Sequence, residues 1–383
     1  MSEIPRDRVG DYAWSGLRRF HNAVFVADLL SRLHAIPAQQ RQNAEKQAAQ
    51  IRYALLQAKE YFDASRVATL ATQPNLMYYC AMSLVLAEIL MKQTGDSSLD
   101  RAREQHRHHG LLFRCAGRWS DITDLGTAGG QLRALPLLDS DGEGLGTFEL
   151  WHRSARELPV GGIVSKIHTA LGASSSGFRL IFGANDTRLN KVPTSGLSLV
   201  DCIASIPGME PAFIGSGVKP TSVRATLEVS EESNVSIRSN FVIVVHPGDA
   251  HLTQKLMDNV LFAPSAWSRI GFIELPSGGI VQWHEEVGDT SALRKLPHAT
   301  MVHSKEVRFW PEDQPLNEFG YLYYALFIAG NYARYYPDWW LRDIERATPL
   351  ALAVEQLMKI SSEQLPLLTL SELSRHLFVR AAP

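Results

Sequence analysis

Residues 75–110 read NLMYYCAMSLVLAEILMKQTGDSSLDRAREQHRHHG, which joins a long apolar run to the densest basic segment of the chain. Glu88 is the only charged residue between Pro74 and Lys92. A helix that is apolar on all sides is buried in a helical assembly rather than laid on its surface. The first half therefore predicts a core helix. Gly95 then interrupts the pattern, and we interpret the run as too short and too interrupted for a membrane span.

Glu88 is the unusual residue of this predicted helix, because a buried carboxylate is costly unless it is paired. One interpretation places it at the edge of the helical assembly, where it meets an arginine. The other makes it a functional acid, since altered pKa values gather at functional sites. Glu88 is therefore included among the candidate binding residues.

The basic half, LDRAREQHRHHG at residues 99–110, contains three arginines and three histidines. On a helix, Arg101 and His108 are seven residues apart and share a face, whereas Arg103 and His108 diverge. An arginine beside a histidine can bind a phosphate and move a proton without a metal. The candidate catalytic residues are Arg101, Arg103 and His108, and His109 is a candidate binding residue. The alternative is a solvated basic helix end whose cations suit the helix dipole.

Composition limits the classes of function and the compartment. The formal net charge is −2, so the chain as a whole is no polyanion binder, and any nucleic-acid role needs a local patch. Cys80, Cys115 and Cys202 lie far apart, which indicates reduced thiols rather than a disulfide framework or a zinc site. The N-terminal residues lack the apolar core of a signal peptide. We expect a cytoplasmic protein without a membrane partner.

The pattern changes three times along the chain. Residues 1–110 predict helices, and residues 111–220 predict a loop-rich connecting region with short helices. Residues 221–310 contain β-branched and aromatic runs such as SNVSIRSNFVIVV, which predict an antiparallel β region. Residues 311–383 return to helical patterns and are expected to pack on the N-terminal part. The predicted fold class is α+β, mainly α, with an antiparallel sheet inserted into a helical bundle.

Two strongly apolar helices carry adjacent tyrosines, at Tyr78–Tyr79 and Tyr323–Tyr324. We expect them to pack together, so that the two ends of the chain form one helical core. Pro337 ends the second of these helices. Beyond it, Ala351–Lys359 and Ser371–Val379 each predict an amphipathic helical piece.

Arg334 lies at the end of the second apolar helix, among several tyrosines and tryptophans. An arginine there can stack on rings or bind a base or a phosphate, which makes Arg334 and Tyr335 candidate binding residues. The structural alternative pairs Arg334 with a carboxylate such as Glu88 or Asp338.

A metal site is the weakest of the chemical hypotheses. His246, Asp249 and His251 in HPGDAH follow a predicted strand, and QWHEE supplies His284, Glu285 and Glu286. No recognised metal spacing is met, and Pro-Gly is an ordinary turn, so no metal ligand is assigned. The glycine-rich segments TAGGQ and GASSSG match no phosphate-binding loop, and no cofactor is predicted.

Several segments together resemble the YaaC-like family of bacterial proteins. They are the N-terminal segment around Trp14, AKEYFDAS (58–65), PNLMYYCAMSLVLAEIL (74–90), HHGL (108–111), LSLVDCIASIPGM (197–209) and FGYLYYALFIAGNYARYYPDWW (319–340). The segments follow the family's order over most of the chain. That family has no settled biochemical activity, so the resemblance implies an architecture rather than a mechanism.

Residues 50–111 are also similar to HEPN helical domains. Many of these are metal-independent ribonucleases with an arginine, four to six residues, and a histidine, a spacing that Arg101 and Arg103 both form with His108. The polar residue that usually follows the arginine is here Ala102 or Glu104, which departs from the pattern in the first case. Ribonuclease members usually dimerise, so the resemblance leaves room for a homodimer.

The sequence thus leads to two classes of function. The first is a HEPN-like, metal-independent ribonuclease or RNA-directed effector in bacterial stress or defence, with RNA or a nucleotide as partner. The alternative is a non-catalytic ligand- or protein-binding module. A metal-dependent hydrolase is a distant third.

Overall fold

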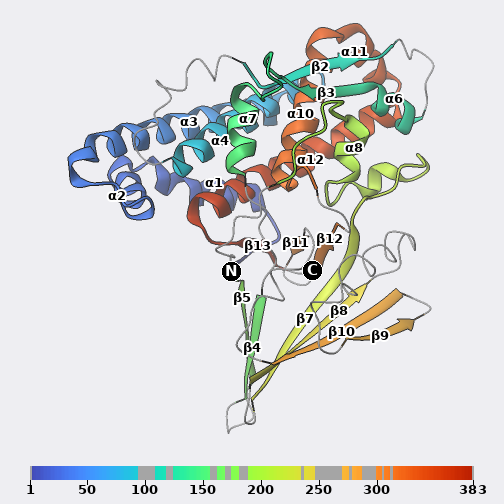
Figure 1. Ribbon diagram of the computed structural model, residues 1–383. Coiled ribbons are helices and arrows are strands. Elements are labelled where there is room, and N and C mark those ends of the chain that lie inside the picture. The colour runs from blue at the N-terminus through green and yellow to red at the C-terminus, as the bar shows by residue number, and fades with distance from the viewer. Residues whose placement is uncertain are drawn as a thin grey trace.

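The protein folds into a helical body with a large β-sheet below it (Figure 1). The computed structural model describes residues 2–93, 108–117, 124–155, 162–168, 174–180, 189–233, 237–245, 270–275, 278–286, 299–303, 306–310 and 314–381. The fold class is α+β and mainly helical, as the sequence predicts.

The helical body combines segments from both ends of the chain. The N-terminal helices are α1 (Val9–Leu17), α2 (Ala23–Leu33), α3 (Arg41–Val67) and α4 (Gln73–Lys92). The C-terminal helices are α10 (Glu318–Tyr335), α11 (Pro337–Glu345) and α12 (Pro349–Ser374). Shorter helices from the middle of the chain are α6 (Leu125–Gln131), α7 (Gly146–Ser154) and α8 (Leu199–Ala204).

The two tyrosine-pair helices α4 and α10 pack directly against each other, which confirms the predicted helical core. The rings of Tyr78 and Tyr323 have centroids 5.5 Å apart. A Cβ atom added at Gly330 of α10 would lie 3.3 Å from Asn75 Cα and from the Pro74 carbonyl oxygen of α4. Gly330 therefore lets the two backbones approach closely.

The apolar helix α4 is long enough to be weighed as a membrane span. It has 20 residues, which makes our interpretation of the run as too short wrong on length. However, 72% of the most apolar 18-residue stretch of α4 is buried inside the protein. Since its apolar surface is already covered by neighbouring helices, α4 is a core helix.

Helix α12 is one continuous helix, whereas the sequence predicts two separate pieces. Pro366 lies inside α12 and has no N–H to donate to the carbonyl oxygen of Ser362. Gly10 of α1 lies against that same oxygen, because a Cβ atom at Gly10 would be 2.6 Å from it. Helix α1 therefore packs on α12 at the point where Pro366 interrupts the backbone hydrogen bonds of α12.

Within the described residues, the large sheet has eight strands in the order β1-β13-β11-β12-β7-β8-β10-β9. They are β1 (Ser2–Ile4), β7 (Val223–Ser233), β8 (Ile237–Val245), β9 (Ile270–Leu275), β10 (Gly278–Glu286), β11 (Ala299–His303), β12 (Glu306–Phe309) and β13 (Phe378–Arg380). The pairs from β11 to β9 are antiparallel, in agreement with the predicted antiparallel region.

The first and last strands of the chain pair in parallel at one end of this sheet. The Ser2 amide donates to the Leu377 carbonyl and the Ala381 amide to the Ile4 carbonyl, both at 2.9 Å. The predicted helical piece Ser371–Val379 is therefore wrong in its last residues. Helix α12 ends because Arg375 takes a left-handed conformation with φ 49°, which turns the chain into β13.

Smaller sheets and irregular segments occupy the connecting region. One sheet contains β2 (Leu111–Cys115), β3 (Leu132–Pro136) and β6 (Leu197–Ser198), and another contains β4 (Gly162–His168) and β5 (Ser174–Leu180). The sequence pattern also predicts a helical segment at Thr253–Phe262, and these residues lie outside those that the structure describes. The division of the chain at 110, 220 and 310 stays a prediction.

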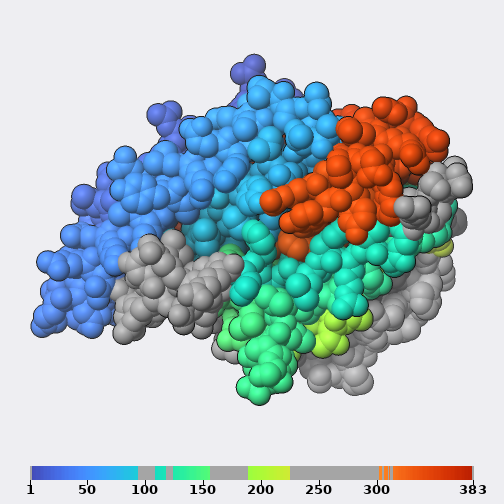
Figure 2. Space-filling model, turned by 90° about the horizontal axis from the view of Figure 1, so that it is seen from above, coloured from blue at the N-terminus to red at the C-terminus, as the bar shows by residue number. Residues whose placement is uncertain are grey.

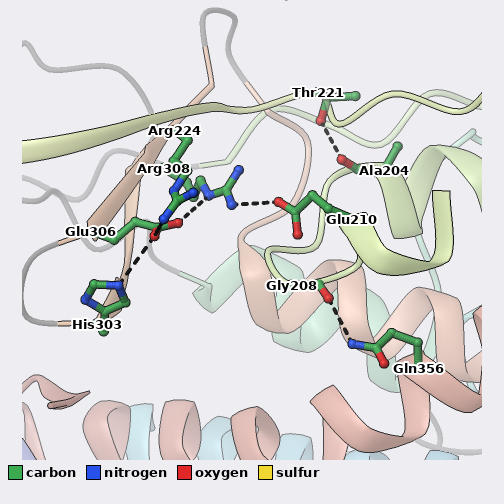
Figure 3. Close-up of polar contacts among 9 residues, drawn as sticks. All are labelled: Ala204, Gly208, Glu210, Thr221, Arg224, His303, Glu306, Arg308 and Gln356. Atoms are coloured by element: carbon green, nitrogen blue, oxygen red, sulfur yellow. Dashed lines mark hydrogen bonds and ion pairs between the residues drawn. The ribbon is translucent and has the colours of Figure 1, made fainter. Parts of the chain in front are cut away.

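A charged cluster centred on two buried residues, Glu306 and Arg308, joins the sheet to the helical body (Figure 3). Glu306 of β12 contacts Arg224 of β7 at 2.8 Å, His303 of β11 at 3.4 Å and its strand neighbour Arg308 at 3.1 Å. Arg308 in turn contacts Glu210, the first residue of the short 3-10 helix Glu210–Phe213, at 2.7 Å. Because Glu306 and Arg308 are only 6% and 8% exposed and satisfy each other, we interpret the cluster as a structural junction.

Candidate functional site

The basic segment that follows α4 is described only at its end. Arg101 and Arg103 lie outside the described residues, so their candidate catalytic role stays a prediction. His108 is described and exposed to solvent.

The main chain at His108 and His109 is fixed by the start of helix α7. The His108 carbonyl accepts a hydrogen bond from the Thr147 amide at 3.0 Å, and the His109 carbonyl accepts one from Phe148 at 3.1 Å. Gly110 makes this seating possible with φ 87°, a conformation that favours glycine. The two histidines are therefore held at a defined place beside the helical core.

His109 contacts the α4–α10 pair at Tyr78 and Met82 of α4. Its Nδ1 atom lies 3.0 Å from the Tyr78 hydroxyl and 3.3 Å from the Met82 sulfur. The Tyr78 hydroxyl in turn lies 3.3 Å from that of Tyr323. A surface histidine is thus connected to two tyrosine hydroxyls of the buried core.

Arg334 lies beside the neighbouring tyrosine of α4. Its guanidinium donates a hydrogen bond to the Tyr79 hydroxyl at 3.1 Å and lies over the Tyr335 ring at 5.2 Å from the centroid. The Tyr79 ring also stacks on Tyr61 of α3, with centroids 5.4 Å apart. The expected pairing of Arg334 with Glu88 or Asp338 is wrong, since no ion pair joins them.

The tyrosines, His109 and Arg334 form one cluster, called here the His109–Arg334 site and defined as Tyr78, Tyr79, His109 and Arg334. The centroids of the Tyr79 and His109 rings are 6.4 Å apart. On the face shown in Figure 2, blue residues of the N-terminal helices, teal residues of the connecting region and orange residues of the C-terminal helices meet. The sequence singled out His109 and Arg334 but did not place them together.

The site repels additional positive charge. The pKa of His109 is lowered, first by burial and then by the positive charges of Arg334 and His108. Among the described residues, no carboxylate forms an ion pair with His109 or Arg334. Within this described part of the chain, a negatively charged ligand would therefore meet two basic groups without a competing acid.

Glu88 is placed elsewhere in the core. It lies nine residues after Tyr79, which is about 14 Å along a helix. The Trp151 indole donates to its carboxylate at 2.8 Å, and Lys92 lies 3.9 Å away. Its partners are thus a tryptophan and a lysine rather than the arginine that the sequence interpretation expected, and it does not join the His109–Arg334 site.

The metal hypothesis finds no support in the described residues. No three histidine, cysteine or acidic side chains come together there in a way that could hold a metal ion. His246, Asp249 and His251 lie outside the described residues, as do the side chains of His284, Glu285 and Glu286. Cys80, Cys115 and Cys202 are free, in agreement with the predicted thiols.

Comparison with known proteins identifies a family without supplying an activity. No curated protein matches the chain. No solved structure matches it either. The family model described as YaaC-like protein matches residues 18–118 and 181–373, which include α4, His109 and Arg334. Since these two stretches cover most of the chain, the protein belongs to the YaaC-like family.

Proposed function

We propose that the protein binds the phosphate group of a nucleotide or of RNA at the His109–Arg334 site. The observation that carries this proposal is the joint placement of Arg334 and His109 around the Tyr78–Tyr79 pair. Guanidinium groups bind phosphate oxygens through charge-assisted hydrogen bonds, and a histidine can donate another. Among the residues that the structure describes, no carboxylate balances the charge of Arg334, as one would for a purely structural arginine.

Aromatic rings beside the site favour a ligand that also carries a base. Tyr335 is 60% exposed and lies under the Arg334 guanidinium. Nucleobases stack on exposed aromatic rings with about 1–3 kcal/mol per base, in a way that tolerates different sequences. A nucleotide or a single-stranded RNA segment would use both the ring and the two basic groups.

The test is the binding of a labelled single-stranded RNA and of nucleoside monophosphates to the purified full chain. Arg334→Ala should weaken binding about tenfold to a hundredfold, because a hydrogen bond to a charged group contributes about 1.5–3 kcal/mol. Arg334→Lys should recover only part of the loss, since lysine lacks the planar fork. His109→Ala should also weaken binding.

The matched control is Arg32→Ala, which removes an exposed arginine of α2, far from α11 in Figure 1. It should bind RNA as the wild type does, apart from a small change in salt dependence. Equal affinities for the wild type, Arg334→Ala and His109→Ala would overturn the proposal.

Metal-independent RNA cleavage is the second candidate function. The observation that favours it is the exposed imidazole of His108, next to the site and on a fixed main chain. In this proposal Arg101 or Arg103 holds the phosphate and His108 moves the proton. Cleavage by the wild type in EDTA should be lost in the Arg101→Ala/Arg103→Ala/His108→Ala variant. Unchanged cleavage by His108→Ala would remove His108 from the mechanism, whereas binding without any cleavage would leave a binding module.

A further inference from the structure

His109, Tyr78 and Tyr323 form a chain of hydrogen-bonding groups that runs from the surface into the core. Tyr78 is 3% exposed and Tyr323 is fully buried. The distances are 3.0 Å from His109 Nδ1 to the Tyr78 hydroxyl and 3.3 Å from there to the Tyr323 hydroxyl. The buried end of this hydrogen-bond chain is covered by an apolar ring, because the ring centroids of Tyr323 and Phe148 lie 5.9 Å apart.

The number of hydroxyl hydrogens decides which group donates and which accepts along this series of hydrogen bonds. Each tyrosine hydroxyl has one hydrogen and can also accept. If Tyr323 donates to Tyr78 and Tyr78 donates to His109 Nδ1, every hydroxyl hydrogen has an acceptor. If His109 Nδ1–H donates instead, Tyr78 donates to Tyr323, and the Tyr323 hydrogen has no acceptor among the described residues. A buried donor without an acceptor costs about 1–3 kcal/mol.

Met82 does not change this balance. Its sulfur lies 3.3 Å from His109 Nδ1 and would accept from a protonated Nδ1. A thioether is a weak acceptor, however, and it is at the surface end of the chain. It gives no acceptor to the Tyr323 hydroxyl hydrogen at the buried end.

We propose that the Tyr323–Tyr78 pair fixes the tautomer of His109, so that its proton sits on Nε2 and is offered to the ligand as a hydrogen-bond donor. Tyr78 and Tyr323 are then positioning residues that act through His109. The proposal rests on the proposed phosphate site for its function, and it names what His109 contributes there: a neutral N–H donor beside the charged Arg334.

The charged and titratable groups around His109 agree with a neutral imidazole. Arg334 on α10 and the adjacent His108 both oppose a positive charge on His109 and, with burial, lower its pKa. Burial holds the pKa of both Tyr78 and Tyr323 well above the ordinary value, so both remain protonated donors. Protonation of His109 would also place a hydrogen on Nδ1, which requires the chain to reverse and leaves the Tyr323 hydrogen without an acceptor.

The ligand chemistry follows from this tautomer. An Nε2–H group binds an acceptor, so the site favours phosphate or carboxylate oxygens over ammonium groups.

The test is a long-range nitrogen–proton correlation spectrum of the full chain with ¹⁵N-labelled histidine, in which His109→Gln identifies the His109 signals. The wild type should show Nε2 protonated and Nδ1 bare at neutral pH. Tyr78→Phe removes the hydroxyl that donates to Nδ1, so both tautomers leave the same Tyr323 hydrogen without an acceptor, and the Nδ1–H form should gain at least about fivefold in population relative to Nε2–H. The pKa of His109 should rise in the same variant.

The matched control is Tyr324→Phe, which removes a neighbouring buried hydroxyl that has no hydrogen-bond partner among the described residues. It should leave the His109 tautomer unchanged. An Nδ1–H tautomer in the wild type, or identical His109 signals in Tyr78→Phe and wild type, would overturn the assignment. If the wild type shows the Nε2–H signal but binds neither RNA nor nucleotides, only the proposed function is overturned.

Discussion

At the scale of single residues, Glu88 shows how a core helix tolerates a charge. Its carboxylate accepts from Trp151, and Lys92 lies between it and Glu372, with the Lys92–Glu372 distance at 3.2 Å. Burial dominates nevertheless and raises the pKa of Glu88 from 4.5 to about 7. The folded protein therefore holds a proton at Glu88 under conditions in which the unfolded chain has released it.

This pKa shift predicts that stability falls as the pH rises. The stabilisation is complete below the unfolded pKa near 4.5 and is lost as the pH rises through the folded pKa near 7. The difference amounts to roughly 3 kcal/mol at most. Glu88→Gln keeps an acceptor for the Trp151 indole without a charge. It should flatten the dependence of the urea-unfolding free energy on pH between 5 and 8, and parallel profiles for the two proteins would contradict the assignment.

At the scale of elements, the contact of α1 with α12 depends on one glycine. Gly10→Ala would place a Cβ atom 2.6 Å from the Ser362 carbonyl oxygen, a backbone atom that cannot move without shifting α12. We expect a loss of about 1–3 kcal/mol in the free energy of unfolding, despite the better helix propensity of alanine. Urea unfolding measures this loss.

Gly130→Ala in α6 is the matched control for that substitution, because nothing lies within 4 Å of a Cβ atom there. It should be neutral or slightly stabilising, since alanine favours helix. A Gly10→Ala protein as stable as the Gly130→Ala protein would show that the seat of α1 on α12 is less tight than the distances indicate.

The charged cluster around Glu306, between the sheet and the helical body, leads to a prediction about the stability of a Glu306 variant. Glu306→Gln removes the charge that faces Arg224, His303 and Arg308, of which Arg308 is 8% exposed. Breaking a buried ion pair from one side costs about 3–5 kcal/mol, and the remaining contact of Arg308 with Glu210 should keep the loss near the lower end.

Glu355→Gln supplies the comparison for the junction, because its ion pair with Lys359 is exposed to solvent. Exposed pairs contribute about 0–1 kcal/mol, so this variant should unfold close to the wild type. Equal unfolding free energies for Glu306→Gln and Glu355→Gln would contradict a structural role for the buried cluster.

At the scale of the whole molecule, the sequence predicted the parts whose signal is local. The uninterrupted apolar runs around Tyr78–Tyr79 and Tyr323–Tyr324 predicted α4 and α10 as core helices. Each helix has apolar side chains on nearly all sides, and packing the two together removes much of this surface from water. Alternating β-branched residues marked the antiparallel strands. Arg334 was recognised because an arginine among aromatic rings is unusual at the end of an apolar helix.

The parts that the sequence did not predict depend on contacts between distant residues. His109 and Arg334 share a site because α4 and α10 pack in one register, which no local pattern specifies. The strands β1 and β13 have three residues each and owe their pairing to partners at the opposite end of the chain. The sequence predicted two helical pieces, Ala351–Lys359 and Ser371–Val379, where α12 is continuous through Pro366, and Gly10 of α1 lies against the Ser362 carbonyl that Pro366 leaves without a donor.

The pairing of the two chain ends leads to a prediction about how stability is distributed. Val379 of β13 is 2% exposed, so Val379→Asp would bury an unpaired carboxylate and open the β1–β13 pair. Because α1 is seated on α12 through Gly10, the helical core should persist. Hydrogen exchange read by mass spectrometry should show lost protection in β1, β11 and β13 and retained protection in α4 and α10, while Val67→Asp, at an 86% exposed position, should change neither. Loss of protection throughout α4 would mean instead that the terminal strands hold the helical core together as well, and that sheet and helices unfold as one unit.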